Sequence, residues 1–288
     1  MNKDIGQIFK KFRKEKGLTL EQASKGVVST SQLSHFERGA GDITVKKFFL
    51  LLENISISEI EFSQILRDYQ QDKDRILFQM IGKFEESGDI DGLVNLYNNE
   101  QYMYLESSNK QKLLNSIAIK SVLIRYGKFN KLTSMEIEVL EDYFYKIEVW
   151  SKINIKIFSL CLLELDSKTI CFYLDDILDQ KVINNQDLEY IELIAVALRN
   201  TIYVLTERHK FSSAQLYMKK FKEMIPKEVG LGLRVSYAIQ EANLFEKLGE
   251  IDKAITIFQN IINCYESFDM KDRIDILKDE LKKLRKKS

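Results

Sequence analysis

Apolar residues recur every three to four positions along almost the whole chain, which is the spacing of amphipathic helices. Near the start, Ile5, Ile8, Phe9 and Phe12 fall on one side of such a helix, and its other side is basic. The 288 residues include one proline and 12 glycines, so little interrupts helix formation. The pattern predicts an all-α protein.

Residues 18–39 have the pattern of two short helices joined by a tight turn. Ser29 is suited to cap the start of the second helix, and Gly39 suits the left-handed position after its end. Leu33 and Phe36 face inward, whereas the opposite side of this helix is polar. The stretch therefore predicts a helix-turn-helix.

Capping residues mark three further helix starts around this motif. Thr19 with Gln22 and Ser58 with Glu61 have the spacing of capping boxes, and Thr44 is placed to cap a helix between them. The expected buried side of that middle helix consists of Val45, Phe48, Phe49, Leu51 and Leu52. Residues 1–65 are thus predicted to form one compact unit of five short helices.

The rest of the chain repeats a turn at intervals close to 40 residues, after a linker at residues 66–74. The turns begin at Gly88, Gly127, Asp166, His209 and Gly249. A repeat of two helices and a turn indicates an α-solenoid, in which each hairpin buries its apolar face on its neighbours. Residues 75–288 are predicted to form about five hairpins, right-handed and similar to tetratricopeptide repeats.

The distribution of charge points to nucleic acid at one end of the chain. Lys plus Arg and Asp plus Glu both number 43, which excludes a uniformly basic coating protein. The first 47 residues, however, hold ten Lys/Arg and five Asp/Glu. A basic end that coincides with a helix-turn-helix predicts binding to double-stranded DNA.

The exposed residues of the second motif helix are the expected readers of base edges, because such a helix enters the major groove. The expected base-reading residues are Thr30, Gln32 and His35. The residues expected to contact phosphates or position the helix are Lys10, Lys14, Lys25, Ser31, Ser34, Arg38, Lys46 and Lys47. For each lysine taken alone, the alternative is an ordinary solvated surface charge.

FKKFRKEKGLTLEQAS and TSQLSHFERG resemble the lambda-repressor-like, XRE-type helix-turn-helix domain. In that family an Arg of the first helix commonly pairs with a Glu near the end of the third. The resemblance therefore implies a structural ion pair between Arg13 and Glu37. Leu20 departs from the pattern, because many members have Gln there and contact DNA from that position.

The two halves together resemble the Rgg/GadR/MutR regulators of Gram-positive bacteria. The resemblance rests on YFYKIEVWSKINIKIFSLCLLELD around Trp150, on residues 198–202 and on HKFSSAQLYMKKF. It implies a cytosolic quorum-sensing receptor for a short, hydrophobic, imported signalling peptide. It also implies a homodimer that binds promoter DNA, with RNA polymerase as a further partner.

The peptide is expected in a concave groove of the repeats, where its backbone needs hydrogen-bond partners. Asn200 is expected to bind one peptide unit, since an amide can donate and accept at once. The other expected groove residues are Lys152, Asn154, Tyr203, Arg234 and Tyr237. The alternative for the two tyrosines is a place in the hairpin core, which is also the role expected for Trp150.

Catalysis is not expected. The two histidines, His35 and His209, lie in different halves, and motifs for phosphate loops, nucleophile elbows or HExxH sites do not occur. No cofactor or metal is therefore predicted. The alternative function is a helix-turn-helix regulator without a peptide ligand, whose repeats bind another protein.

The expected location is the cytoplasm. The N-terminus is amphipathic rather than a signal peptide, and the most apolar stretch is too short to cross a bilayer. The three cysteines are expected to be small buried residues of a reduced protein.

Overall fold

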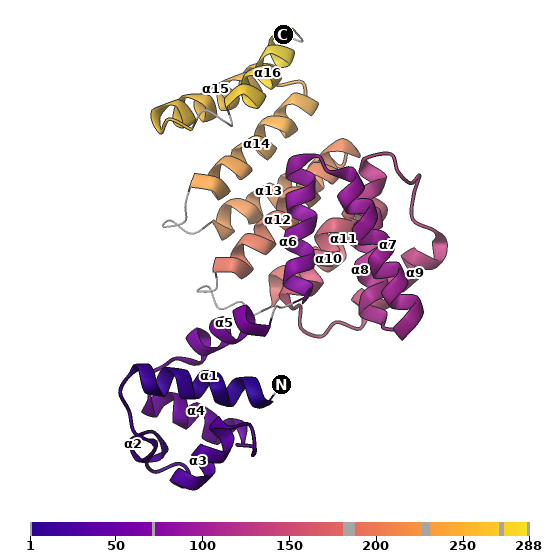
Figure 1. Ribbon diagram of the computed structural model, residues 1–288. Coiled ribbons are helices and arrows are strands. Elements are labelled where there is room, and N and C mark those ends of the chain that lie inside the picture. Colours follow the sequence, from indigo (N-terminus) through magenta and orange to yellow (C-terminus); the bar gives the residue numbers. More distant parts are fainter. Residues whose placement is uncertain (1, 71–72, 181–187, 226–230, 271–273, 287–288) are drawn as a thin grey trace. The chain divides into compact units, whose positions relative to one another are not determined.

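The computed structural model describes residues 2–70, 73–180, 188–225, 231–270 and 274–286, and all its regular elements are helices (Figure 1). The all-α prediction is thus confirmed for these residues. The chain divides into two compact units, residues 1–80 and 81–288, which are described separately.

The first unit contains five helices around one core. They are α1 (Asn2–Glu15), α2 (Leu20–Ser24), α3 (Thr30–Glu37), α4 (Val45–Asn54) and α5 (Glu59–Gln70). Phe9, Leu33 and Leu51 are completely buried, and the ring of Phe48 lies 5.1 Å from that of Phe62. This core holds the two helices of the motif, α2 and α3, in place.

Two of the predicted caps form, but the third does not act through its side chain. Thr19 and Gln22 make both hydrogen bonds of a capping box, and Ser58 Oγ accepts from the backbone of Glu61. Thr44 has the backbone conformation of a cap, yet its hydroxyl makes no capping hydrogen bond. The start of α4 is therefore less fixed than the sequence suggests.

The expected buried side of α4 is also only partly correct. Leu51 and Leu52 are buried, whereas Val45 is 68% exposed and Phe49 42% exposed. Both exposed residues lie in the first half of α4, whereas Leu51 and Leu52 lie in its second half, and the helix packs on α2. Asn54 shows where the two meet, because its amide donates to the carbonyls of Ala23 and Lys25 at the end of α4.

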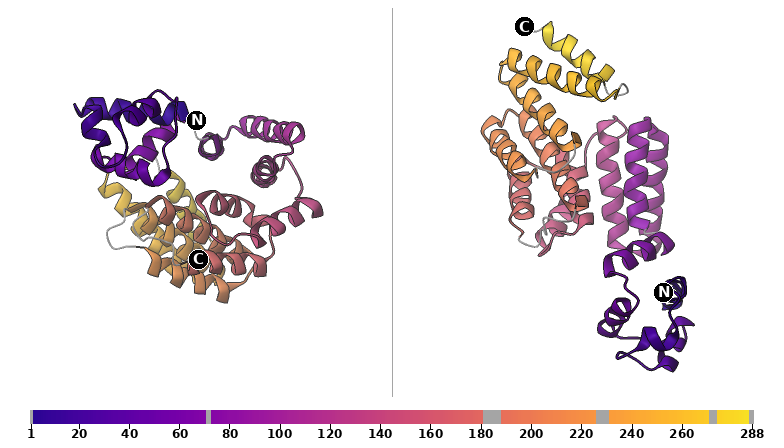
Figure 2. Two further views of the ribbon diagram at one scale, coloured as in Figure 1. Left: turned by 90° about the horizontal axis from the view of Figure 1, so that it is seen from below. Right: turned by 90° about the vertical axis from the view of Figure 1, so that its left-hand side faces the viewer.

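The second unit continues from α6 (Lys73–Ser87), which spans the division. Its remaining elements are α7 (Ile90–Ser107), α8 (Lys110–Arg125), α9 (Ser134–Tyr145), α10 (Lys152–Cys161), the 3-10 helix η1 (Leu162–Glu164), α11 (Ser167–Asp179), α12 (Leu188–Glu207), α13 (Phe211–Met224), α14 (Leu231–Lys247), α15 (Ile251–Ser267) and α16 (Ile274–Arg285). Figure 2 shows α10 to α15 following one another as packed layers.

Each predicted turn separates two helices of this unit. Gly88, Gly127 and Gly249 have positive φ angles, and His209 takes the same left-handed conformation at φ 56°. The fourth turn differs slightly, because Asp166 caps α11 and Ser167 already belongs to that helix.

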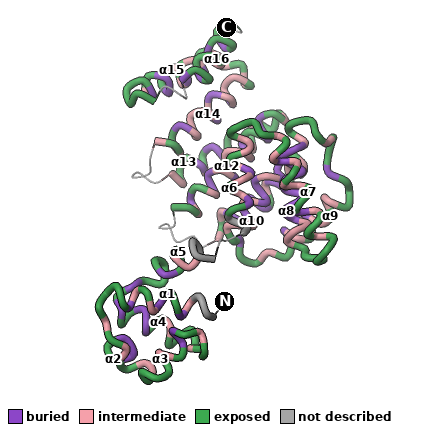
Figure 3. Tube along the Cα trace, in the orientation of Figure 1, coloured by how far each residue is buried: buried purple, intermediate pink, exposed green. Residues whose placement is uncertain are grey.

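The first helices of successive hairpins form the interior of the unit. α10 packs against both α8 and α12, and α12 in turn packs against α14. Residues Leu114 to Leu123 of α8 are all buried, and the tube of Figure 3 shows the buried residues gathered along these helices. Side chains on α12 and its neighbours are thus held by a continuous core.

Candidate nucleic-acid interface and peptide site

Helix α3 presents the three expected base readers to solvent. Thr30, Gln32 and His35 are exposed, and their side chains make no hydrogen bond within the described part of the chain. Ser29 fixes the helix start, since its Oγ accepts from Gln32 N at 3.1 Å. Ser31 is exposed and Ser34 half-buried. A rigid backbone with unengaged polar side chains is what base reading requires.

Arg13 and Glu37 form a buried ion pair behind α3. Arg13 Nε donates to Glu37 Oε1 at 2.6 Å and a terminal nitrogen donates to Oε2 at 2.8 Å, while Arg13 is 7% and Glu37 2% exposed. The hydrogen bond with Glu37 raises the pKa of Arg13, against the effect of burial. A further bond of 2.7 Å joins Arg13 to the carbonyl of Leu18. The pair therefore ties α1, α3 and the start of α2 together, away from the solvent that DNA would occupy.

The residues expected to contact phosphates lie in the same unit as α3. Lys14, Lys25, Arg38, Lys46 and Lys47 are exposed, and Lys10 is half-buried. Within the part of the chain that the structure describes, none of these six is in an ion pair. Their charges are therefore available for phosphates, which position a protein on DNA without reading sequence.

Lys152 and Asn154 are already engaged at the start of α10. Lys152 Nζ lies 2.5 Å from Glu189 Oε2. Asn154 Oδ1 accepts from Ser151 N at 2.7 Å in a capping box, and its Nδ2 donates to the hydroxyl of Tyr143 at 2.6 Å. The structure thus gives both side chains partners within the fold, and their part in binding a peptide stays a prediction. Ser151, three residues before Asn154, was the sequence signal for this cap.

Asn200 lies on α12 with half of its hydrogen-bonding capacity in use. Its Nδ2 donates to the carbonyl of Ser159 at 3.3 Å, and its Oδ1 accepts from Arg199 Nε at 3.2 Å. An amide has two donor hydrogens and two acceptor lone pairs, so one of each remains. Tyr203, one turn further along α12, is 45% exposed. The two residues can therefore offer hydrogen bonds and an aromatic surface together.

Tyr237 of α14 is held within the fold. Its hydroxyl donates to Glu241 Oε1 at 3.0 Å, and its ring lies 5.8 Å from that of Phe221. Burial, with the charge of Glu241, raises its pKa to about 12. Its environment is that of a hairpin core, the alternative that the sequence left open.

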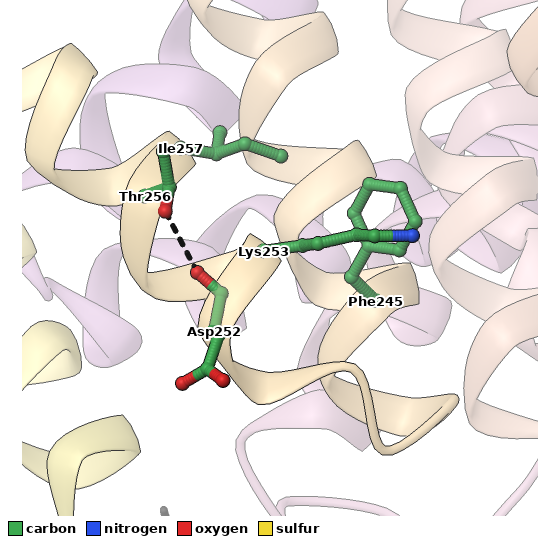
Figure 4. A pocket seen from close by; sticks show the side chains of 5 residues that line it. All are labelled: Phe245, Asp252, Lys253, Thr256 and Ile257. Carbon is green, nitrogen blue, oxygen red and sulfur yellow. Dashed lines mark hydrogen bonds between the residues drawn. The ribbon is translucent and has the colours of Figure 1, made fainter.

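Arg234 lies on the same helix at the edge of a hollow between α14 and α15. This hollow has a volume of about 300 Å³ and is also lined by Ala238 and Ile257. A second hollow, of about 370 Å³, shares Ile257 with it (Figure 4). Figure 4 shows Lys253 beside Phe245, where its Nζ lies 5.0 Å from the ring centroid, and the hydroxyl of Thr256 donating to the Asp252 carbonyl at 2.8 Å. The expected groove residues thus lie on three helices: α10, α12 and α14.

Trp150 is buried at the centre of an aromatic cluster. It is 1% exposed, and the rings of Phe144 and Phe158 both lie 5.7 Å from it. Its Nε1 donates to Asp176 Oδ2 at 2.7 Å. Its backbone carbonyl accepts from the Tyr190 hydroxyl at 2.9 Å. These contacts give Trp150 the structural role expected from the sequence.

Two family models match the chain. The model described as the C-terminal domain of the HTH-type transcriptional regulator Rgg matches residues 94–275, well over half of the chain. A helix-turn-helix model matches residues 9–62. The chain belongs to the Rgg family.

Solved structures share the fold of this Rgg-family protein over nearly its whole length. The SHP pheromone receptor Rgg2 of Streptococcus dysgalactiae aligns with a TM-score of 0.78 and 16% identity, covering 97% of this chain and 99% of that one. A putative transcriptional regulator of Listeria monocytogenes aligns with a TM-score of 0.80 and 20% identity, covering 100% of this chain and 99% of that one. The PrgX/cCF10 complex aligns with a TM-score of 0.71 and 18% identity, covering 97% of this chain and 99% of that one.

The solved structures show the shared fold, and the two family models confirm the Rgg assignment and the class of function. The protein is a helix-turn-helix transcriptional regulator of the Rgg type, and its family and fold are not those of enzymes. Among the described residues of this Rgg-family protein, no helix is both long and apolar enough to span a membrane. The same residues contain no group of three or more acidic, His or Cys side chains placed to hold a metal ion.

Proposed function

We propose that this protein is a cytoplasmic receptor for a short signalling peptide, and that the peptide controls its action at promoter DNA. The DNA-reading part of the proposal rests on α3, whose exposed Thr30, Gln32 and His35 stand on a helix fixed by the Arg13–Glu37 pair. The flanking basic residues supply the phosphate contacts. Binding as a homodimer follows from the two half-sites that helix-turn-helix proteins commonly read.

The observation that carries the peptide part is the state of Asn200. It is half-buried on α12, held by bonds to Ser159 and Arg199, and still has one donor and one acceptor site. An extended peptide needs such a pair for each backbone unit removed from water. Tyr203 provides an adjacent apolar surface for a hydrophobic side chain.

The solved relatives support the same class of ligand. One similar structure is described as a bacterial peptide pheromone and receptor complex, and others are PrgX with cCF10 or iCF10. Those descriptions concern the relatives, which are 18%, 18% and 17% identical to this chain and share its fold. The ligand of this protein therefore has to be sought with its own residues as the guide.

Fluorescence polarisation of the purified protein on DNA from upstream of its own gene tests both parts. We expect sequence-selective binding that falls steeply with salt, because phosphate contacts release counterions. Peptides encoded beside the gene are then added, with and without DNA. If the protein binds its DNA selectively but binds none of these peptides, and none of them changes its DNA binding, the result would favour a regulator whose repeats bind another protein.

We propose RNA polymerase as a further partner at the promoter. A ligand can act there without changing DNA affinity, by favouring one arrangement of the dimer over another. Transcription in a purified system, with and without the neighbouring peptides, separates this effect from a change in DNA binding.

A further inference from the structure

Three helices of the second unit bring charged side chains together around Arg199, which is hydrogen-bonded to Asn200. Glu85 comes from the end of α6, Arg125 from the end of α8 and Arg199 from α12. Glu85 is already committed, because its Oε1 lies 3.1 Å from a terminal nitrogen of Arg125. The cluster therefore contains two guanidinium groups and one carboxylate, which leaves it one positive charge in excess.

Arg199 carries the unbalanced charge. It is half-buried, and its Nε donates to Asn200 Oδ1 at 3.2 Å. Its terminal nitrogens make no hydrogen bond, and its guanidinium no ion pair, within the residues that the structure describes. A guanidinium has five N–H donors, so most of its donors remain available for a ligand.

The surroundings of Arg199 are unfavourable for its charge. Burial lowers its pKa, the nearby charge of Arg125 lowers it further, and only Glu85 acts in the opposite direction. Arginine stays protonated in proteins, so the group remains a partly dehydrated cation. A second anion would relieve the repulsion between the two guanidinium groups.

We propose that Arg199 binds a carboxylate of the peptide, next to the peptide unit that Asn200 holds. This inference rests on the proposed function, and it adds the chemistry of the ligand: an acidic peptide rather than a wholly apolar one. The terminal nitrogens of Arg199 can bind both oxygens of a carboxylate, which is the strongest hydrogen-bonded arrangement that guanidinium makes. Because Arg199 and Asn200 are consecutive, the carboxylate belongs at or beside that peptide unit.

Access to the cluster remains open. The side chain of Arg125 is 35% exposed and that of Glu85 25% exposed, so the charged groups are not sealed from solvent. Lys152, one of the cations expected in the groove, forms an ion pair with Glu189. The carboxylate itself can be an Asp or Glu side chain or the C-terminus of the peptide.

The test uses the full-length protein and defined peptide pools. Fluorescein-labelled peptides of about eight residues have apolar residues at all positions except one, which is fixed as Asp, Asn or Lys. Every pool is made with a free C-terminus and with a C-terminal amide. We expect an Asp pool to bind about tenfold more tightly than its Asn counterpart, or the free acids more tightly than the amides. The first result identifies a side-chain carboxylate, and the second a terminal one.

Variants at Arg199 assign the preference to this residue. Arg199→Met should abolish the preference for a peptide carboxylate, and Arg199→Lys should retain part of that preference. Arg199→Glu should instead bind the Lys pool most tightly. Arg285→Met, an exposed position on α16 with the same change of charge, should behave as the wild type. The gain of affinity in Arg199→Glu keeps the test decisive even if one variant folds poorly.

An acid preference that Arg199→Met leaves unchanged would overturn the inference, as would a wild type that binds peptides without any preference for a carboxylate. Both results leave the proposed receptor function standing. A wild type that binds its DNA selectively but no peptide pool would overturn the receptor function and this inference together.

Discussion

At the scale of single residues, the Arg13–Glu37 pair shows why a charged side chain can be essential without touching a ligand. Each partner compensates the other's charge inside an otherwise apolar core, through two hydrogen bonds of 2.6 and 2.8 Å. The pair lies behind α3, so losing it should loosen the base readers as well as the core. Stability and DNA binding are therefore coupled at this position.

Arg13→Ala should lower the free energy of unfolding of the first unit by about 3–5 kcal/mol, because it leaves Glu37 buried and unpaired. DNA binding should weaken with it. Thermal unfolding and fluorescence polarisation on the same samples measure the two effects, with Lys11→Ala on the exposed side of α1 as the control. An unchanged melting temperature with lost binding would instead indicate direct contact between Arg13 and DNA.

Gln32 is the opposite case, an exposed side chain that we propose to contact a base of the DNA. Gln32→Ala should relax discrimination at one base pair by about 1–3 kcal/mol, since a glutamine amide can make two hydrogen bonds to adenine. Selection of binding sites from random DNA, by wild type and variant, measures the change. The same preferred sequence in both would remove Gln32 from the base readers.

Residue roles that depend on distant partners were the least predictable from sequence. Asn154 and Lys152 have the chemistry of ligand contacts, but their partners Tyr143 and Glu189 come from other helices. Glu100 is a further example, because it is 3% exposed and receives hydrogen bonds from Lys112 and Asn115 across the α7–α8 interface. A linear sequence does not state which helix will face which.

At the scale of helices, close packing and capping can each be tested at one position. α1 crosses α3 so closely that a methyl group added to Gly6 would lie 2.0 Å from the Phe36 carbonyl oxygen. In α6, the same addition at Gly82 meets no atom within 4 Å. The two glycines therefore serve opposite purposes, although both lie inside helices.

Gly6→Ala should destabilise the first unit by about 3 kcal/mol, because two backbones must separate. Gly82→Ala should stabilise the second unit by about 0.5–1 kcal/mol, because alanine loses less conformational entropy than glycine when it enters a helix. Denaturant unfolding followed by circular dichroism measures both. A neutral Gly6→Ala would show that α1 and α3 are less closely packed than described.

The cap of α9 predicts a dependence of stability on pH. Burial raises the pKa of Glu136, but hydrogen bonds from Lys120 and Thr133 outweigh it, so the pKa lies below its ordinary value. The ionised carboxylate of Glu136 therefore contributes fully to the free energy of unfolding above the ordinary carboxyl pKa. This contribution is lost as the pH falls through the lowered pKa. Glu136→Gln should reduce the loss of melting temperature between about pH 6 and pH 3.

Asp166 remains in that variant as a second source of the same dependence. A hydrogen bond from Thr169 lowers its pKa, so some sensitivity to acid should persist. An identical loss of melting temperature in wild type and Glu136→Gln would contradict the role of this cap.

Helix boundaries were largely predictable, because turns and caps have local signals. Gly88 and Gly249 mark two hairpins directly, and His209 could be placed only because it falls at the same repeat position. The exposure of Val45 and Phe49 was not predictable, since α4 has apolar residues on more than one side and only its packing decides which are covered. Local chemistry sets where helices begin and end, whereas packing decides which sides they bury.

At the scale of the whole molecule, we propose that the first unit reads DNA and that the second senses a peptide. Asn200→Ala should abolish the response to a peptide while leaving basal DNA binding intact, because α12 belongs to the second unit alone. Transcription and polarisation assays with and without peptide measure the two activities. A normal response would mean that the peptide binds elsewhere.

The same division was evident in the sequence through a change of pattern. Charge and a short motif identified the DNA-binding end, and the repeat near 40 residues identified the other. The excess positive charge around Arg199 was not visible there, because Glu85, Arg125 and Arg199 lie far apart along the chain. Side chains from distant helices form such a cluster only in the folded chain.

The burial of Trp150 also equips the protein with an internal optical probe. It is the one tryptophan of the sequence, and it lies in the second unit with its Nε1 bonded to Asp176. Selective excitation of tryptophan should therefore give blue-shifted emission that reports the unfolding of this unit alone. Circular dichroism follows the helices of both units, so a difference between the two melting curves would measure how independently the two units unfold.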